Sequence, residues 1–437
     1  MSLVAAVLVL TVAAYVGFQA WSFNSGLKRS SALDGVSGSG VPAAAGPGPG
    51  PALRPGSVAG GPPGKPDTNV LVMGLDSRLD EFGNPLPPHL YEALHAGDQS
   101  DGGLNANVLM FFHIPGDGSR ATEISIPRDD NVELVGCPAG VCEGKIKQAY
   151  GLAFDQESRR LTKEGGHSKE EAQQLARDAG RRTQVATVQK FLGDVPVDHF
   201  VEVTMAAFYQ IAEVVQPITV CVKQDTQDSY SGANFRAGQQ QVSAAQAVAF
   251  VRQRRDNVHP ELLFTDLDRE RRQQAFVTSL LSQLRQAQTF TNPGKIQQIL
   301  DVAKQNTAID SRLDLLSFLG EAKSLAGGNI TFYALPVERF GKNSRGEDVN
   351  YVNLPQIRMT VKALLSGQPV PGSAPPAGPG GASPPVPGPT PSPPSAPAPA
   401  PTPGQVPVPV PADGGGQAGP APTDLSALTG GGVPCVK

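Results

Sequence analysis

The sequence lacks several features that would point to a function directly. Only 17% of its 437 residues are charged, and a formal net charge of -4 gives no electrostatic attraction toward nucleic acid. It contains neither a P-loop nor a GxGxxG fingerprint. His113, His199 and His259 are isolated, and no Ser-His-Asp arrangement is recognisable. We therefore expect no nucleic-acid partner, no nucleotide-binding loop and no catalytic triad.

Cysteine is scarce as well, with four residues in the chain. Cys137 and Cys142 enclose a short run of turn residues, and the favoured interpretation is a short-loop disulfide in an oxidising compartment. Two free thiols are the alternative, and zinc is not expected because no histidine pair accompanies them. The pairing of Cys221 and Cys435 is left open.

One long apolar run is present, at residues 3–23, and it carries no charge. Its length predicts a transmembrane anchor over residues 1–23, with a cleaved signal peptide as the alternative. Lys28 and Arg29 follow this run, so the positive-inside rule alone would leave the rest of the chain in the cytoplasm. A true start upstream of Met1, with basic residues in it, would remove that conflict.

Glycine and proline are abundant, with 49 and 42 residues, and they concentrate in two stretches. Residues 24–66 have few large apolar side chains and are interpreted as a linker. Residues 368–437 are interpreted as a disordered Pro/Gly/Ala-rich tail, in which the PxP runs favour polyproline II geometry. The last residues regain some apolar character, which makes a terminal anchor point through Cys435 conceivable.

Residues 67–367 form the predicted globular domain. Apolar or alternating segments of strand length occur at 70–73, 108–112, 122–126, 200–203, 217–222 and 330–335. Helical periodicity occurs at 168–192, 204–214, 242–255, 266–288 and 310–326. Because the first strands are continuously apolar, both faces of the sheet should be covered. The order of elements therefore predicts an α/β fold, an α/β/α sandwich with a central mixed sheet.

Charged residues follow two of the predicted strands. Asp76 and Arg78 come after the first strand, and Arg128 and Asp129 come after the third, beyond Pro127. In open α/β sheets, ligands bind beyond the carboxyl ends of the strands, so these residues share one edge if the two strands run parallel. Any one of these arginines by itself could equally be a solvated side chain or part of a loop salt bridge.

Two predicted helices add further arginines. Ser243 is a candidate cap for a helix that carries Arg252 and Arg254 at its far end, where they could simply complement the helix dipole. The next helix begins near Asp266, and its residues Arg269, Arg272, Gln273, Phe276 and Leu280 share one face. Since the polar part of that face leads into its apolar part, these side chains should point into a pocket that binds an anion.

Together these segments resemble the LytR-CpsA-Psr family of bacterial envelope proteins. The similarity covers most of 67–290 and rests on the order and spacing of residues 69–78, 125–129, 145–150, 198–203, 244–254 and 266–274. The resemblance implies a single-pass membrane protein whose domain lies outside the cell. It also implies a phosphotransferase that holds a polyprenyl pyrophosphate in a hydrophobic tunnel. Such an enzyme moves a glycopolymer, with its linking phosphate, to a muramoyl hydroxyl of peptidoglycan.

The expected partners are therefore a polyprenyl-pyrophosphate-linked glycopolymer, the peptidoglycan acceptor and the membrane. The richness in alanine, glycine and proline suggests a high-GC genome, in which arabinogalactan is a common wall polymer. The arginines that bind pyrophosphate or act in catalysis in the family map to Arg78, Arg128, Arg252, Arg254, Arg269 and Arg272, with Gln273 beside them. The family's magnesium carboxylates map to Asp76 and to a position just before the second strand, so Mg²⁺ is the expected cofactor, with Mn²⁺ as the alternative ion.

That last position departs from the family pattern. Asn107 occupies the place where the family commonly has aspartate, and Asp101 lies farther upstream on a longer loop. Either Asp101 reaches the metal or Asn107 is a neutral and weaker ligand. The extra positive charge of Arg255 is a candidate compensation.

The mechanistic hypothesis divides the charged residues by role. Arg128, Arg252 and Arg254 would hold the phosphate oxygens on which charge builds up, while Arg269, Arg272 and Gln273 would grip the carrier side. Asp129 or Asp266 would orient an arginine or accept the proton of the incoming hydroxyl. The alternatives are a carrier-binding envelope scaffold or regulator and, as a weaker reading, pyrophosphate hydrolysis without an acceptor.

Overall fold

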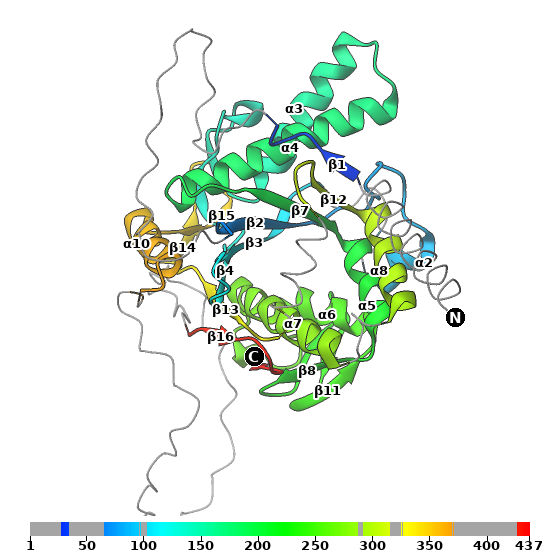
Figure 1. Cartoon of the computed structure of the whole chain (residues 1–437), viewed down its shortest axis with the longest axis vertical. Coiled ribbons are helices and arrows are strands. Elements are labelled where there is room, and N and C mark those ends of the chain that lie inside the picture. The colour runs from blue at the N-terminus through cyan, green and yellow to red at the C-terminus, as the bar shows by residue number, and fades with distance from the viewer. Residues whose placement is uncertain are drawn as a thin grey trace, which may run out of the picture.

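The fold is described from a computed structural model. It describes residues 28–34, 65–95, 97, 103–286, 292–314, 325, 327–368, 370 and 426–437. Figure 1 shows a sheet running through the middle of the molecule with helices on either side. The predicted α/β fold with a mixed central sheet is confirmed.

The sheet has eight strands, in the order β1-β12-β7-β2-β3-β4-β13-β16. Their bounds, in that order, are Lys28–Ser30, Thr307–Asp310, His199–Thr204, Thr68–Leu75, Ala106–Ile114, Ala121–Ser125, Ile330–Ala334 and Leu428–Thr429. Strand β3 runs antiparallel to both of its neighbours, β2 and β4. Those two strands therefore point the same way, and Asp76 and Arg128 lie beyond their carboxyl ends at one edge, as expected.

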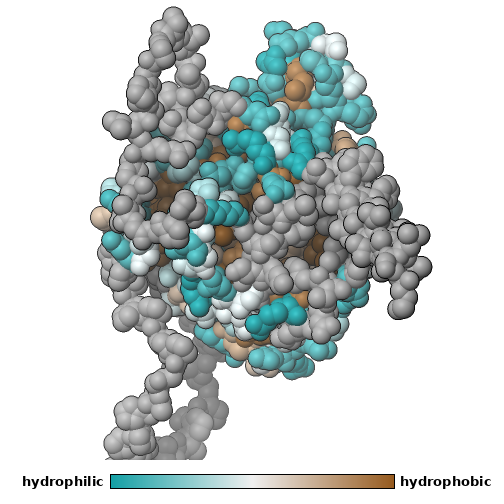
Figure 2. Space-filling model, viewed as in Figure 1, coloured by the Kyte–Doolittle hydropathy of each residue, from teal (hydrophilic) through white to brown (hydrophobic). Residues whose placement is uncertain are grey.

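Helices cover both faces of this sheet (Figure 1). On one side lie α3 (Gln148–Glu164), α4 (Lys169–Leu192) and α10 (Leu354–Leu365). On the other side lie α5 (Met205–Val215), α6 (Ala244–Arg252), α7 (Asp266–Gln286) and α8 (Pro293–Asn306). The outer end of the α3–α4 hairpin, at the top of Figure 2, is mainly hydrophilic.

Alternate residues of the central strands serve two separate cores. One core, under α3, α4 and α10, includes Leu71, Met73, Phe111, Phe200 and Ile357. The opposite face contributes Val72, Val108 and Phe112, which pack with Val277 and Leu281 of α7. At Gly74 the register between β2 and β3 shifts, and an added Cβ would lie 2.8 Å from the Cβ of Val108. Glycine is needed there so that the strands can approach closely where β2 ends.

Smaller elements complete the described part. The second sheet joins β11 (Gly238–Val242), β8 (Ile218–Val222) and β17 (Cys435–Val436) beneath α7. Three hairpins pair β9 (Thr226–Asp228) with β10 (Ala233–Phe235), β14 (Arg339–Lys342) with β15 (Asp348–Tyr351), and β5 (Asn131–Glu133) with β6 (Glu143–Lys145). Short helices are α2 (Pro88–Ala93), η1 (Pro138–Gly140) and η2 (Pro260–Leu262).

Some secondary-structure expectations differ from the structure. The helix expected over 310–326 is wrong at its start, because Thr307–Asp310 form a strand that pairs with β7; residues 315–324 lie outside the described residues. Helices α3, α8 and α10 were not expected. Helix α3 buries only Ala149, Tyr150, Ala153 and Leu161. Leu152 and Phe154 of the same helix are partly buried against the core, so α3 has an apolar face that was missed.

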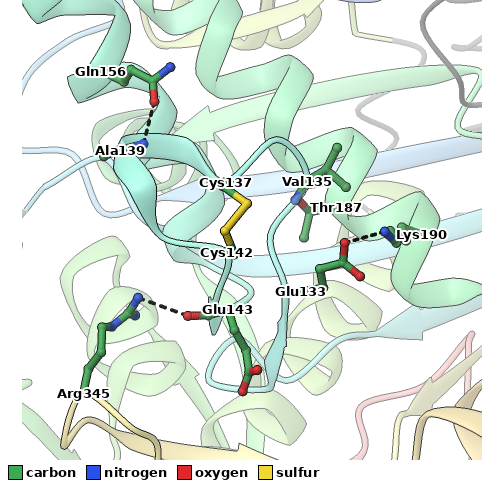
Figure 3. Close-up of a disulfide and its surroundings, with 10 residues drawn as sticks. All are labelled: Glu133, Val135, Cys137, Ala139, Cys142, Glu143, Gln156, Thr187, Lys190 and Arg345. Carbon is green, nitrogen blue, oxygen red and sulfur yellow. Dashed lines mark hydrogen bonds and ion pairs between the residues drawn. A yellow bond between two sulfur atoms is a disulfide. The ribbon is translucent and has the colours of Figure 1, made fainter.

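The expected Cys137–Cys142 disulfide is confirmed and closes the loop at η1 (Figure 3). Cys221 and Cys435 form a second disulfide, across 214 residues of sequence. It holds β17 against β8, while β16 pairs with β13. Residues 426–437 are therefore part of the fold rather than of the expected disordered tail, because strand pairing and a covalent link fix them. Residues 371–425 of that tail lie outside the described residues.

The expected N-terminal segments are described only in part. The linker expectation over 24–66 is wrong at Lys28–Ser30, because these residues pair with β12 at the edge of the main sheet. The predicted anchor at residues 1–23 lies outside the described residues. Within the described ranges, no helix has the length and apolarity required to span a bilayer.

Candidate active site

A cavity of about 620 Å³ lies between the sheet and helices α5, α6 and α7. One part of its wall is apolar and is formed by Val72, Leu75, Val108, Met110, Val203, Met205, Phe208, Val248, Val251, Phe276 and Val277. The other part is polar and is formed by Asp76, Arg78, His95, Asn107, Arg128, Thr204, Asp228, Tyr230, Ser231, Arg252, Arg254, Arg255, Arg269 and Gln273. An apolar cavity that ends in a cluster of arginines suits a molecule with an apolar tail and an anionic head.

The carboxyl end of β2 and the start of β3 meet in a chain of hydrogen bonds. Asn107 donates from Nδ2 to Asp76 Oδ2 at 2.8 Å and accepts at Oδ1 from Arg128 Nη1, also at 2.8 Å. Arg78 donates to the other oxygen of Asp76. Asn107 therefore bridges a carboxylate and a guanidinium, which an aspartate at that position could not do without placing two carboxylates together.

Arg128 is held from its other side by the first turn of α7. Its Nε and Nη2 donate to the two oxygens of Asp266 at 3.0 and 3.1 Å, a bidentate pair. Arg269 donates from Nη2 to the same carboxylate at 2.8 Å. Burial opposes ionisation of Asp266, but Arg269 and Arg128 hold its pKa below the ordinary range. Asp266 therefore stays charged and orients two arginines that line the cavity.

Asp129 does not line the cavity. Its carboxylate lies 2.7 Å from Lys147 Nζ, 3.6 Å from Lys145 Nζ and 3.4 Å from Arg128 Nε. These contacts place it behind Arg128, because the chain turns into the β5–β6 hairpin after Arg128. Its geometry is that of a residue that orients Arg128 rather than one that touches a ligand.

Arg252 and Arg254, at and just beyond the end of α6, line the cavity as expected. Ser243 forms a capping box with Gln246, which starts the helix, and Arg252 occupies its last turn. Arg252 donates to the backbone oxygens of Leu94 and His95, and burial lowers its pKa. Arg254, two residues on, is exposed and lines the cavity without a hydrogen bond or ion pair to the described residues.

The first turns of α7 split the residues that were expected to share one face. Arg269 and Gln273 line the cavity, and Gln273 donates to the backbone oxygen of Val251 at 3.3 Å. Burial lowers the pKa of Arg269 to about 10. Asp268 accepts from the backbone N–H of Thr265 at 2.8 Å, a contact that caps the start of α7.

The expectation that Arg272 faces the cavity is wrong. It is fully buried and donates from Nε to the backbone oxygen of Lys437 at 2.6 Å and from Nη2 to Thr226 Oγ1 at 3.2 Å. Its guanidinium also lies within 4.9 to 5.6 Å of the rings of Phe235, Phe250 and Phe264. The second sheet and the C-terminal segment cover this side of α7. A projection of one helix does not show which distant residues cover each of its faces.

Several cavity residues were missed at the level of sequence. Asp228 ends β9, Tyr230 and Ser231 lie in the loop between β9 and β10, and His95 follows α2. They lie in short, polar segments without periodicity, so the sequence around them indicated a turn and gave no sign of a binding site. Arg255, expected as a spare positive charge, stacks on Tyr230 with its Cζ 4.2 Å from the ring centroid.

The expected metal ligands can be compared with the donor set of the cavity. Asp101 lies outside the described residues, and Asn107 points its oxygen at Arg128. Across the described ranges, no cluster of three or more histidine, cysteine, aspartate or glutamate side chains is placed to hold a metal ion. Mg²⁺ is commonly held by one or two carboxylates together with substrate phosphates, and Asp76 fits that limited role.

The chain is similar to known proteins in sequence. The model of the LytR_cpsA_psr family matches residues 60–365. The cell wall biosynthesis protein LcpA of Corynebacterium glutamicum is 34% identical over 306 residues, which are 70% of this chain and 57% of that protein. This chain thus spans little more than half of that relative.

Other relatives are more distant. A protein named polyisoprenyl-teichoic acid--peptidoglycan teichoic acid transferase TagU, from Halalkalibacterium halodurans, is 24% identical over 66% of this chain and 74% of its own length. Among solved structures, protein gbs0355 from Streptococcus agalactiae aligns with a TM-score of 0.49 and 19% identity. That alignment covers 71% of this chain and 90% of the solved chain.

Proposed function

The chain belongs to the LytR_cpsA_psr family, and from this premise we propose that it is a phosphotransferase of cell-wall assembly. The family resemblance expected from the motifs is confirmed. The proposed reaction moves a glycopolymer, with its linking phosphate, from a polyprenyl-pyrophosphate carrier to peptidoglycan. The observation that carries the proposal is the gathering of Arg78, Arg128, Arg252, Arg254 and Arg269 at the polar end of an apolar cavity.

The relatives' names support the same chemistry. TagU is named as a transferase from a polyisoprenyl-linked polymer to peptidoglycan, and LcpA as a cell-wall biosynthesis protein. In the proposed step, the acceptor hydroxyl oxygen bonds to the phosphorus that carries the glycopolymer. The bond from that phosphorus to the oxygen of the polyprenyl phosphate breaks, the polyprenyl phosphate leaves, and the hydroxyl proton passes to solvent or to a base.

Phosphoryl transfer requires alignment and charge neutralisation more than covalent chemistry from the protein. Arg128, Arg252 and Arg254 would hold the oxygens on which charge accumulates. Arg269 and Gln273 would hold the carrier phosphate, while the buried Arg272 would support α7 without touching the ligand. Because the pKa of Asp266 is lowered, this carboxylate would orient Arg128 and Arg269 rather than accept a proton.

The cofactor and the location are parts of the same proposal. Asp76 would hold Mg²⁺, or Mn²⁺, against the phosphates, and the ion would neutralise charge on them. The apolar run at residues 3–23 would anchor the protein in the membrane by a single pass, with the domain outside the cell. Two disulfides among the described residues support an oxidising compartment.

The test is a transfer assay with the full-length protein, Mg²⁺, a polyprenyl-pyrophosphate-linked oligosaccharide and peptidoglycan. Donors that carry arabinogalactan or teichoic acid fragments would identify the polymer. Arg254→Ala should reduce the transfer rate on the order of 10²-fold, because it removes a charge that stabilises the transition state. Since Arg254 is exposed, the thermal unfolding midpoint of the Arg254→Ala variant should equal that of the unmodified protein.

Arg236→Ala is the matched control, because Arg236 is an exposed arginine outside the cavity that pairs only with Asp225 across the described residues. Equal transfer rates for the two variants would contradict the assignment of Arg254. The scaffold alternative is favoured by Asn107, whose amide occupies a position where a second carboxylate would hold metal. Tight donor binding without transfer would support it, and release of phosphate without acceptor would indicate hydrolysis.

A further inference from the structure

An aromatic side chain stands at the open end of the cavity with no role in the proposed phosphoryl transfer. Tyr230 is 66% exposed although it lines the cavity. Arg255, also exposed, lies over its ring at 4.2 Å. A single exposed aromatic residue is ordinary on a protein surface, so the surroundings of Tyr230 decide whether it has a function.

The loop that carries Tyr230 is fixed by hydrogen bonds. Asp228, only 2% exposed, accepts from the backbone N–H of Tyr230 at 3.0 Å and from Ser231 Oγ at 2.8 Å. Asn257 Oδ1 accepts from the backbone N–H of Ser229 at 2.9 Å. The structure therefore fixes the backbone that carries Tyr230 before any ligand arrives, which lowers the entropy lost on binding.

Tyr230 lines the same cavity as the arginines proposed to bind phosphate. Arg255 directly follows Arg254, and consecutive Cα atoms are about 3.8 Å apart. A group that contacts Tyr230 and Arg255 would thus be the next unit beyond the phosphate held by Arg254. In the proposed reaction, the units next to that phosphate are sugars: the first residue of the transferred glycopolymer and the accepting residue of peptidoglycan.

We propose that Tyr230 and Arg255 form a sugar-binding subsite at the rim of the cavity. The inference rests on the proposed function and extends it. An aromatic ring offers a rigid apolar surface to the C–H face of a pyranose, and the guanidinium offers donors to its hydroxyl, acetamido or carboxylate oxygens. The pair would set the position of the sugar relative to the reacting phosphorus.

The test measures kcat and KM separately for donor and acceptor in Tyr230→Ala, Tyr230→Phe and Arg255→Ala. Tyr230→Ala should raise one of the two KM values roughly tenfold, since an aromatic contact of this kind has that order of effect. Tyr230→Phe should stay near the unmodified protein, because it keeps the ring. The KM that rises, for donor or for acceptor, identifies which glycan occupies the subsite.

A second stacked pair supplies the control. Arg339 lies over the ring of Tyr351 at 3.7 Å on the β14–β15 hairpin, outside the cavity. Tyr351→Ala should leave both KM values unchanged. If Tyr230→Ala also leaves both unchanged, the subsite does not exist. If it instead weakens sedimentation with anionic phospholipid vesicles while both KM values hold, the ring contacts the bilayer and the proposal is overturned.

Binding measurements separate this inference from the proposed function. Calorimetry with a soluble peptidoglycan disaccharide oligomer and with a short-chain donor analogue reports on the subsite even if no transfer occurs. Weaker binding of either probe by Tyr230→Ala, with no transfer by the unmodified protein, would keep the subsite and reject the transferase. Full transfer, with unchanged binding and unchanged KM in Tyr230→Ala, would support the transferase and reject the subsite.

Discussion

Two clusters of arginine and carboxylate lie on opposite faces of the same sheet, and they are built differently. Beneath α4, Arg177 and Arg181 pair with Glu81 and Glu202, and all four side chains are fully buried. On the α7 face, among the described residues, six arginines and two aspartates line the cavity. The first cluster is closed and sets two arginines against two glutamates, whereas the second is open and has an excess of arginine.

The difference separates a structural use of arginine from a binding use. Burial opposes ionisation of Glu202, yet Arg181 and Arg177 lower its pKa, whereas burial and the charge of Glu202 raise the pKa of Glu81. Because the side chains of this cluster are fully buried, a ligand cannot reach them. At the cavity, Asp76 accepts from Arg78, and Asp266, which does not line the cavity, holds Arg128 and Arg269. Arg254 is exposed to an incoming anion.

The largest effect is expected from breaking the closed cluster. Glu202→Gln keeps the size of the side chain but removes one of the two fully buried carboxylates that pair with Arg177 and Arg181, and Glu81 is then the one fully buried carboxylate that pairs with both. The free energy of unfolding should fall by about 3–5 kcal/mol, measured by urea denaturation. Glu133→Gln, which breaks the exposed pair with Lys190, is the control and should change it little. A loss as small as that of the control would show that the cluster is dispensable for stability.

The next test adds a carboxylate to the cavity cluster, which brings its ratio of carboxylates to arginines closer to that of the buried cluster. Asn107→Asp would place a second carboxylate against Asp76, where the Nδ2 atom of Asn107 now donates at 2.8 Å. A divalent ion should then bind more tightly, on the order of tenfold, because the ligand charge increases. Titration with Mn²⁺ followed by electron paramagnetic resonance would measure this. Asn234→Asp, on an exposed strand position, adds the same charge elsewhere, and equal affinities in the two variants would argue against metal at residue 107.

The last test concerns Glu270, a carboxyl group on α7 that is buried without an ion pair among the described residues. Burial raises its pKa from 4.5 to about 8. Because the folded state holds this proton more tightly than the unfolded state, the contribution to stability is complete below about pH 4.5. It is lost as the pH rises toward 8.

Glu270→Gln should therefore gain stability relative to the unmodified protein between pH 5 and pH 8, where the unmodified glutamate must stay neutral or ionise at a cost. Thermal unfolding of both proteins at several pH values in this range is the measurement. Parallel pH profiles would mean that the carboxyl group is not desolvated as the structure indicates.

Much of the framework could be predicted from local patterns. The apolar runs around Leu71 and Phe111 identified central strands, and Pro127 marked the end of another. The position of Asp76 and Arg128 followed from strand direction, which two antiparallel pairings with β3 confirmed. The ordered segment 426–437 escaped prediction, because pairing with distant strands and a disulfide stabilise it rather than its own sequence period.

The predictions about site residues divide in the same way. Arg269 and Arg272 are three positions apart on one helix, and a helical projection places them on one side. The second sheet and Lys437 cover Arg272, while the cavity opens beside Arg269. Tyr230 and Arg255 meet across two loops that have no periodicity to read.

The amino-acid sequence alone determined the central strands and several of the helices, where the arginines follow them and to which family the chain belongs, because hydrophobic period and motif spacing are properties of neighbouring residues. Only the tertiary structure decided which guanidinium groups face the cavity, which are sealed by carboxylates and which aromatic ring stands at the rim. Those outcomes depend on what packs over each side chain, and the covering groups come from residues far away in the chain.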